Sequence, residues 1–208
     1  MIYDLTVDTV KSMRAPEYLD LIATTITETR ADGHGQLVGS WVSDIGQLNE
    51  VIHLWRFRDL NERDRFCADL SQRRAGIEEK ARTLEKRRTS TILRALMDVT
   101  PPPSSGYVYE LRHYWLMSGA TPQWAKLFLD AMPARKQYST VVGLWAAEGD
   151  RGNEVYHLWA YKDLKERAEV RAAALRNTAW QAFVIADTPL LDEMENMILL
   201  PTRYSPLA

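Results

Sequence analysis

The chain has 208 residues, of which 46% are hydrophobic and 26% charged, and its formal net charge is −2 at pH 7. This balance is ordinary for a globular protein and gives no overall attraction to nucleic acid or anionic lipid. One cysteine, Cys67, excludes an internal disulfide and a cysteine-based zinc site, and so favours a reducing compartment. With no signal-like amino terminus and no apolar run near the roughly 20 residues that span a bilayer, we expect a cytoplasmic protein without a membrane span.

Each half of the chain is predicted to follow the order β-α-β-β-α-β. The first half should contain a strand over 2–7, a helix from Pro16, two strands joined near Gly46, a helix from Asp59 and a strand over 91–97. The second half should contain a strand over 107–115, a helix from Pro122, two strands joined at 149–152, a helix from Asp163 and a strand over 196–200. Proline suits a first helical turn, and aspartate followed three residues later by glutamate indicates a capping box.

The two halves are copies of one unit. Without gaps, three segments match three others: 37–41 with 141–145, 49–55 with 153–159, and 59–63 with 163–167. Outside this window the first copy carries two extra residues, in the glycine-rich stretch 32–35, and Tyr3-Asp4-Leu5 then matches Tyr109-Glu110-Leu111. The proline-rich stretch 100–106 separates the copies, so we predict domains over 1–100 and 106–208.

The predicted order is the ferredoxin-like arrangement, an antiparallel sheet with helices on one face. The other face needs a cover, and the second copy can supply it. We therefore predict an α+β fold in which two tandem ferredoxin-like domains pack as an intrachain dimeric α+β barrel.

Three matched motifs carry a family resemblance: Gly-x-Trp, then Asn-Glu-Val-x-His-Leu-Trp, then Asp-Leu-x-x-Arg. With the ending from Met197 to Leu207, they resemble the NIPSNAP family over nearly the whole chain. The resemblance implies two α+β barrel domains and often further dimerisation. The wider superfamily includes cofactor-independent monooxygenases, haem-degrading monooxygenases, isomerases and decarboxylases, and fold alone does not choose among them. One departure is that the first copy lacks a tryptophan matching Trp180.

His53 and His157 lie at matching positions within predicted strands and are the leading catalytic candidates. Strand alternation places Trp55 and Trp159 on the face of their histidine, and an in-phase hairpin would add Trp41 and Trp145, each above a glycine. A histidine among tryptophans could serve as a general base near neutral pH. The alternative is structural: a core histidine that donates a hydrogen bond to a backbone carbonyl.

The first strand of each copy carries charge where a ferredoxin-like sheet is central. Asp4 and Glu110 match, and Arg112 follows Glu110 on the same face. Either these groups form a mutual or cross-copy ion pair, or they face a polar cavity that holds substrate. We take Glu110 as a third catalytic candidate, and Arg112, Tyr109 and His113 of the same strand as substrate-binding candidates. Arg63 and Arg167 are expected to form pairs near the starts of their helices.

Two functions remain open. The first is a cofactor-independent enzyme, of monooxygenase, isomerase or lyase type, that acts on a small, partly aromatic metabolite in a barrel cavity; a role in biosynthesis and homo-oligomers would accompany it. The second is a non-catalytic module that binds a small ligand or another protein. We expect no metal and no cofactor, with haem on His53 or His157 as the alternative. The basic run 73–88 alternates with glutamates and is predicted to be a solvated helix, not a nucleic-acid site.

Overall fold

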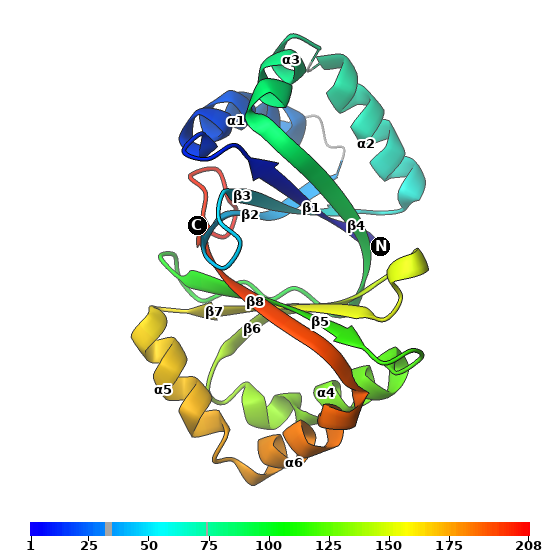
Figure 1. Cartoon of the computed structure of the whole chain (residues 1–208), viewed down its shortest axis with the longest axis vertical. Coiled ribbons are helices and arrows are strands. Elements are labelled where there is room, and N and C mark those ends of the chain that lie inside the picture. The colour runs from blue at the N-terminus through cyan, green and yellow to red at the C-terminus, as the bar shows by residue number, and fades with distance from the viewer. Residues whose placement is uncertain (32–34, 74) are drawn as a thin grey trace. The chain divides into compact units, whose positions relative to one another are not determined.

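The computed structural model describes residues 1–31, 35–73 and 75–208. Asp32, Gly33 and His34, where the first copy carries its insertion, lie outside the described residues. So does Arg74, in the basic run of the first copy. The described residues form eight strands and six α-helices (Figure 1), in two compact units. Unit 1 comprises 1–93 and 200–208, and unit 2 comprises 94–199.

Unit 1 is an antiparallel sheet with the strand order β4-β1-β3-β2. Its elements are, in chain order, β1 Ile2–Val10, α1 Ala15–Ala31, β2 Gln36–Ile45, β3 Glu50–Phe57, α2 Leu60–Arg73, α3 Ala75–Leu84 and β4 Glu85–Met97. The part of β4 after Leu93 belongs to unit 2. An apolar cluster that includes Tyr18 and Ile22 of α1, Trp55 of β3 and Phe66 of α2 joins the helices to the sheet.

Unit 2 repeats the arrangement with the strand order β8-β5-β7-β6. Its elements are β5 Val108–Leu116, α4 Thr121–Arg135, β6 Thr140–Ala147, the 3-10 helix Gly149–Arg151, β7 Glu154–Tyr161, α5 Leu164–Ala174, α6 Thr178–Asp187, the 3-10 helix Thr188–Leu190 and β8 Leu191–Pro201. Helices α4, α5 and α6 lie on one face of this sheet (Figure 1). The first strand of each copy is central, as predicted.

The second helical segment of each copy differs from the prediction. A single helix was expected, but α2 and α3 divide it in unit 1, and α5 and α6 divide it in unit 2. In unit 2 the division falls at Asn177, whose side chain accepts hydrogen bonds from the N–H groups of Ala179 and Trp180 and so starts a new helix. The predicted solvated helix over 73–88 is also wrong at its end, because β4 begins at Glu85. Likewise β8 begins at Leu191 and not at residue 196.

The predicted capping boxes are present in both copies. Asp59 accepts from the N–H of Glu62 at 2.9 Å, and Asp163 accepts from that of Glu166 at 2.7 Å. Each glutamate reaches back to the N–H one residue before the cap, Arg58 in unit 1 and Lys162 in unit 2. The helix starts are thereby fixed at the ends of β3 and β7.

The register of the hairpins corrects one prediction about the tryptophans. Trp41 is paired with Ile52 and Trp145 with Tyr156, so neither lies on the face of its histidine. The reason is a bulge between Leu37 and Gly39, repeated between Val141 and Gly143. One extra residue on β2 or β6 moves every later side chain to the opposite face.

The expected glycine–tryptophan contact is nevertheless present in both copies. A Cβ added to Gly39 would lie 2.2 Å from the ring of Trp41, and one added to Gly143 would lie 2.2 Å from that of Trp145. Each indole therefore covers a strand position that only glycine can occupy.

Candidate functional site

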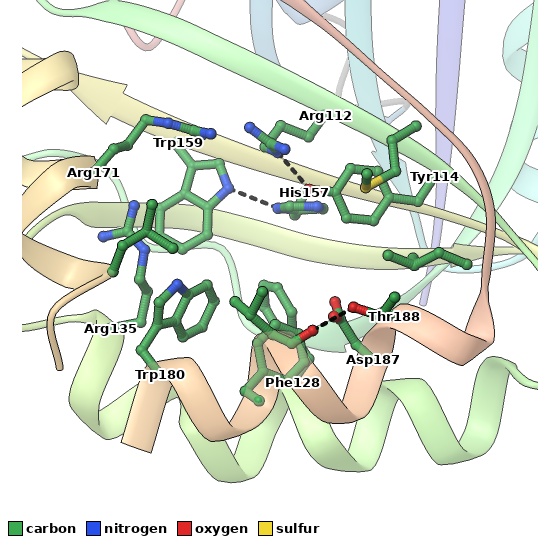
Figure 2. A pocket seen from close by; sticks show the side chains of 15 residues that line it. Arg112, Tyr114, Phe128, Arg135, His157, Trp159, Arg171, Trp180, Asp187 and Thr188 are labelled. Carbon is green, nitrogen blue, oxygen red and sulfur yellow. Dashed lines mark hydrogen bonds between the residues drawn. The ribbon is translucent and has the colours of Figure 1, made fainter. Parts of the chain in front are cut away.

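A cavity of about 250 Å³ lies within unit 2, between its sheet and its helices. Strands β5, β7 and β8 form its floor with Arg112, Tyr114, His157, Trp159 and Met194. Helices α4, α5 and α6 cover it (Figure 2), mainly with the side chains Phe128, Arg135, Arg171, Trp180, Phe183 and Asp187. The prediction was of a cavity in the barrel, and all the residues that line this one belong to unit 2.

Glu110 holds a cluster of arginines against the cavity. Its side chain is fully buried, and its carboxylate accepts from Arg112 at 2.9 Å, from Arg167 at 2.7 Å and from Arg171 at 3.3 Å. Burial alone would raise the pKa of Glu110, but the hydrogen bond from Arg167 and the charges of Arg112 and Arg171 hold that pKa below its ordinary value. One carboxylate thus neutralises one of three guanidinium groups, and two of these, Arg112 and Arg171, line the cavity.

Arg135 adds a further buried positive charge. It is 3% exposed, and its guanidinium lies 4.4 Å from the ring of Trp159 and 5.4 Å from that of Trp180. It donates to Ser139 Oγ at 2.7 Å, and none of the carboxylates in the described part of the chain lies within ion-pair distance of it. Burial lowers the pKa of Arg135, yet an arginine stays charged in proteins. Stacking on two indoles compensates part of the cost of burying this charge.

His157 lines the cavity, and its ring has one nitrogen that can donate. It is 2% exposed, and its Nδ1 accepts the indole N–H of Trp159 at 2.7 Å (Figure 2). Because indole can only donate, Nδ1 must carry the lone pair, and in the neutral ring the proton is on Nε2. Nε2 has no hydrogen-bond partner among the residues that the structure describes.

The same environment keeps His157 neutral. Burial lowers its pKa well below the ordinary value of 6.5, and the positive charges of Arg112, Arg135 and Arg171 lower it further. A neutral ring whose lone pair is already engaged by Trp159 is a poor base. The geometry therefore changes the role expected of His157 from general base to hydrogen-bond donor.

Asp187, at the end of α6, provides the carboxylate of the cavity, and the sequence analysis did not single it out. It is 6% exposed and lies among aromatic side chains; in Figure 2 it is at the right of the view, with Arg135 and Arg171 at the left. Burial raises its pKa from 3.8 to about 6, with the indole of Trp124 opposing the rise. A carboxylate with this pKa is suited to take up a proton near neutral pH.

A family model described as NIPSNAP matches residues 3–98 and again 109–206. The chain belongs to the NIPSNAP family. It is 30% identical to NipSnap homolog 1 of Danio rerio over 92% of this chain and 73% of that protein. It is 31% identical to NipSnap homolog 2 of Homo sapiens over 99% of this chain and 74% of that protein.

Solved structures with low sequence identity share the fold of this NIPSNAP chain. A candidate monooxygenase of Lactobacillus acidophilus matches with a TM-score of 0.71 and 13% identity, covering 100% of this chain and 98% of that one. A second candidate monooxygenase, from Fusobacterium nucleatum, also has a TM-score of 0.71, with 9% identity over 96% of this chain and 91% of that one. These matches show the predicted fold class, an α+β chain of the dimeric α+β barrel type with two tandem domains.

In the first NIPSNAP domain the counterpart of the arginine cluster is smaller. Asp4 accepts from Arg63 at 2.6 Å and from the hydroxyl of Ser90 at 2.7 Å. Arg63 and Arg167 were expected to form pairs near the starts of their helices. Each also reaches the carboxylate on the first strand of its own unit, Asp4 or Glu110. Two alternatives were left open for Asp4 and Glu110, an ion pair or a polar cavity. Both carboxylates form ion pairs, and in unit 2 two of the arginines that pair with Glu110, Arg112 and Arg171, also line the cavity.

His53 has different neighbours from His157. Its Nε2 lies 3.1 Å from the hydroxyl of Tyr204, and its Nδ1 lies 3.8 Å from Asp8. Trp55, also a candidate from sequence, packs in the apolar cluster of unit 1 against Phe57 and Phe66. The two catalytic histidine candidates thus occupy matching strand positions in unlike surroundings.

The remaining sequence candidates lie away from the cavity. His113 and Tyr109 are on the opposite face of β5 from Arg112, and His113 contacts Glu154 at 2.8 Å and Glu195 at 3.2 Å. Trp145 lies on the corresponding face of β6, and Trp41 is in unit 1. Arg112, His157 and Trp159 line the cavity, and Glu110 contacts two of the arginines that line it.

A metal or a haem iron on Nε2 of His157 would conflict with the hydrogen bond that Nδ1 accepts from Trp159. The described residues include no group of three or more His, Cys, Asp or Glu side chains placed to hold a metal ion. A metal on Nε2 of His157 would leave a proton on Nδ1, which would then oppose the N–H of Trp159 at 2.7 Å. None of the helices in the described ranges combines the length and apolar character needed to cross a membrane.

Proposed function

We propose that unit 2 is a cofactor-independent active site for a small, partly aromatic anion, most simply an aryl carboxylate. The observation that carries this proposal is the pairing of excess positive charge with one free donor in a largely aromatic cavity. Arg112, Arg135 and Arg171 face the cavity; among the described residues Glu110 pairs with Arg112 and Arg171, and Asp187 is the carboxylate that lines the cavity. Buried cations without full compensation favour an anionic ligand.

The cavity separates the groups that an acid–base reaction needs. The arginines hold the carboxylate of the substrate, and the rings of Phe128, Trp159 and Trp180 pack against its aromatic part. Asp187 takes a proton from the substrate. The electron pair left behind moves onto an oxygen of the substrate, which accepts a hydrogen bond from Nε2–H of His157.

This first step is shared by the reactions expected from the sequence. Return of the proton to a different atom gives isomerisation, and expulsion of a leaving group gives a lyase reaction. Attack of the same anion on dioxygen, taken up from solution, gives oxygenation without a cofactor. The geometry supports the common deprotonation, and the course after it depends on the substrate.

Phenylpyruvate is a suitable probe, because it combines a ring, a carboxylate and an acidic C–H beside a carbonyl. We expect it to bind unit 2 and to exchange its benzylic protons with deuterated solvent faster than in buffer, as followed by NMR. Asp187→Asn should keep binding, measured by calorimetry, and lose the accelerated exchange. Binding without accelerated exchange by the natural chain would support the non-catalytic alternative, and no binding of any aryl carboxylate would overturn the proposal.

A further inference from the structure

Unit 1 contains a phenol beside its histidine, and this phenol comes from the end of the chain. The hydroxyl of Tyr204 lies 3.1 Å from Nε2 of His53, with the two rings inclined by only 10°. The segment is held against α1 and β2, because Arg203 contacts Asp20 of α1 at 2.7 Å and the N–H of Thr202 donates to the carbonyl of Ser40 of β2 at 3.0 Å.

The tyrosine lies in the layer between the sheet and the helices. It packs against the apolar cluster that contains Tyr18 and Ile22 of α1. In the repeat these two residues correspond to Trp124 and Phe128 of α4, and both of those rings lie near His157, with centroids 6.1 and 5.1 Å from its own. The phenol of Tyr204 therefore occupies, in unit 1, the layer that contains the cavity in unit 2.

Unit 2 has no such residue for His157. The repeat that matches Ile92-Leu93 with Ile198-Leu199 matches Asp98 with Tyr204, and Asp98 is exposed. Nε2 of His157 is buried without a hydrogen-bond partner in the described part of the chain, and the His157 side chain lines the cavity. In unit 1 the chain thus supplies a phenol to Nε2 of its histidine, whereas the described part of unit 2 supplies none to Nε2 of His157.

We infer that the ligand of unit 2 is a hydroxyaryl compound whose oxygen binds Nε2–H of His157 as the aryloxide anion. This inference rests on the proposed function and names its substrate class. Tyr204 is the stand-in for the ligand ring, and the cavity of about 250 Å³ suits a compound built on one or two rings.

The anionic form follows from the direction of the hydrogen bond. In unit 2 the bond from Trp159 to Nδ1 leaves Nε2 as a donor, so the ligand oxygen must accept. An aryloxide accepts more strongly than a neutral phenol, and the surrounding arginines favour its charge. Binding then breaks the O–H bond of the phenol, and the proton passes to solvent. A ring ketone that loses an adjacent C–H proton to Asp187 yields the same anion, which links this ligand class to the proposed reaction.

The test uses 4-nitrophenol, whose anion absorbs visible light while the neutral form does not. Titrated with the full-length protein at a pH below the solution pKa of the probe, it should develop the phenolate band, and the apparent pKa of the bound probe should fall by at least one unit. Nitrobenzene, which lacks the hydroxyl group, should bind at least tenfold more weakly.

Two variants separate the role of His157 from a general loss of folding. Trp159→Phe removes the N–H that fixes the tautomer and should reduce the shift of the bound probe, while circular dichroism stays unchanged. His157→Gln keeps an N–H donor and should retain part of the shift, whereas His157→Leu should abolish it.

The outcomes distinguish this inference from the proposed function. Binding of 4-nitrophenol in its neutral form, or an unchanged shift in His157→Leu, would overturn the aryloxide inference. Binding of benzoate with no binding of 4-nitrophenol would overturn the hydroxyaryl class and leave the proposed function standing. Failure of both probes to bind would overturn both.

Discussion

The two NIPSNAP units place different chemistry on matching positions of one scaffold. In unit 1 the interior near His53 contains a polar network, in which the Tyr18 hydroxyl lies 2.9 Å from Asp8 and 2.8 Å from Glu85, and Arg88 contacts both carboxylates. In unit 2 the corresponding positions are aromatic or aliphatic, namely Trp124, Tyr114, Leu191 and Met194. The last three line the cavity.

The difference shows how two copies of one domain can differ in role, with a polar network inside one copy and a cavity inside the other. In unit 1 Arg88 contacts the carboxylates of Asp8 and Glu85, and the hydroxyl of Tyr204 lies beside Nε2 of His53. In unit 2, Nε2 of His157 has no hydrogen-bond partner and Arg135 no paired carboxylate among the described residues, and buried groups of this kind favour the anionic ligand proposed above. The following four predictions test this contrast.

The largest expected effect is on the chemistry of unit 2. Asp187→Asn should slow proton exchange of phenylpyruvate by about 10²–10⁴-fold, the usual contribution of a general base. The same change should stabilise the protein at pH 7 by at most about 3 kcal/mol, because a pKa near 6 means that the buried carboxylate is ionised at a cost. Chemical denaturation measures the second effect, and Asp192→Asn, an exposed neighbour on β8, is the matched control. Loss of stability in Asp187→Asn would contradict this account.

The next effect belongs to the network of unit 1. Arg88→Met leaves Asp8 and Glu85 without their cation and should lower the free energy of unfolding by about 2–4 kcal/mol, somewhat less than for a fully buried pair because Arg88 is partly exposed. Met194→Leu, the matched change in unit 2, should cost less than about 1.5 kcal/mol. Ligand binding should survive Arg88→Met. Equal costs in the two units would remove the distinction drawn between them.

Arg135→Met should separate binding from stability. Removing a cation that stacks on Trp159 and Trp180 should weaken benzoate binding by roughly tenfold or more, since a buried charge partner typically contributes over 1 kcal/mol. Stability should change little or rise, because no described carboxylate pairs with this arginine. Lys126→Met, on the same helix but exposed, provides the control. Unaltered affinity would show that the anion binds elsewhere.

The smallest effect is a slope in stability against pH. The pKa of His157 is depressed in the folded protein, so its contribution to the free energy of unfolding is fully present above about pH 6.5. This contribution is lost as the pH falls, because the unfolded chain takes up a proton that the folded chain excludes. One such group changes stability by about 1.4 kcal/mol per pH unit. Asp187 acts in the opposite sense below pH 6, so the comparison of His157 with His157→Gln belongs in the Asp187→Asn background. A slope that is the same with and without His157 would contradict a buried neutral ring.

The order of helices and strands was predictable because each sequence pattern that indicates one of them occurs in both copies. The capping boxes at Asp59 and Asp163 and the strand positions of His53 and His157 follow from local pattern alone. The bulge before Gly39 was not predictable from alternation, since one inserted residue leaves no mark in composition. Because the bulge was not foreseen, the prediction placed Trp41 and Trp145 on the wrong face of their strands.

The site was only partly predictable. Arg112, His157 and Trp159 were found because strand alternation relates them, but Arg135, Arg171 and Asp187 lie on helices whose rotation a sequence does not fix. The change of role for His157 depends on a single hydrogen bond from Trp159. One available signal was missed: Trp180, noted as absent from the first copy, marks the helix α6 that also carries Asp187.

Unit 1 incorporates residues 200–208, which are synthesised after all of unit 2. Domains usually fold in order as they leave the ribosome, beginning with the amino-terminal one. Here the amino-terminal half must wait for the carboxyl-terminal residues before its histidine meets Tyr204, so the half with the earlier start is completed last. A cut in the proline-rich stretch would therefore not release two finished domains.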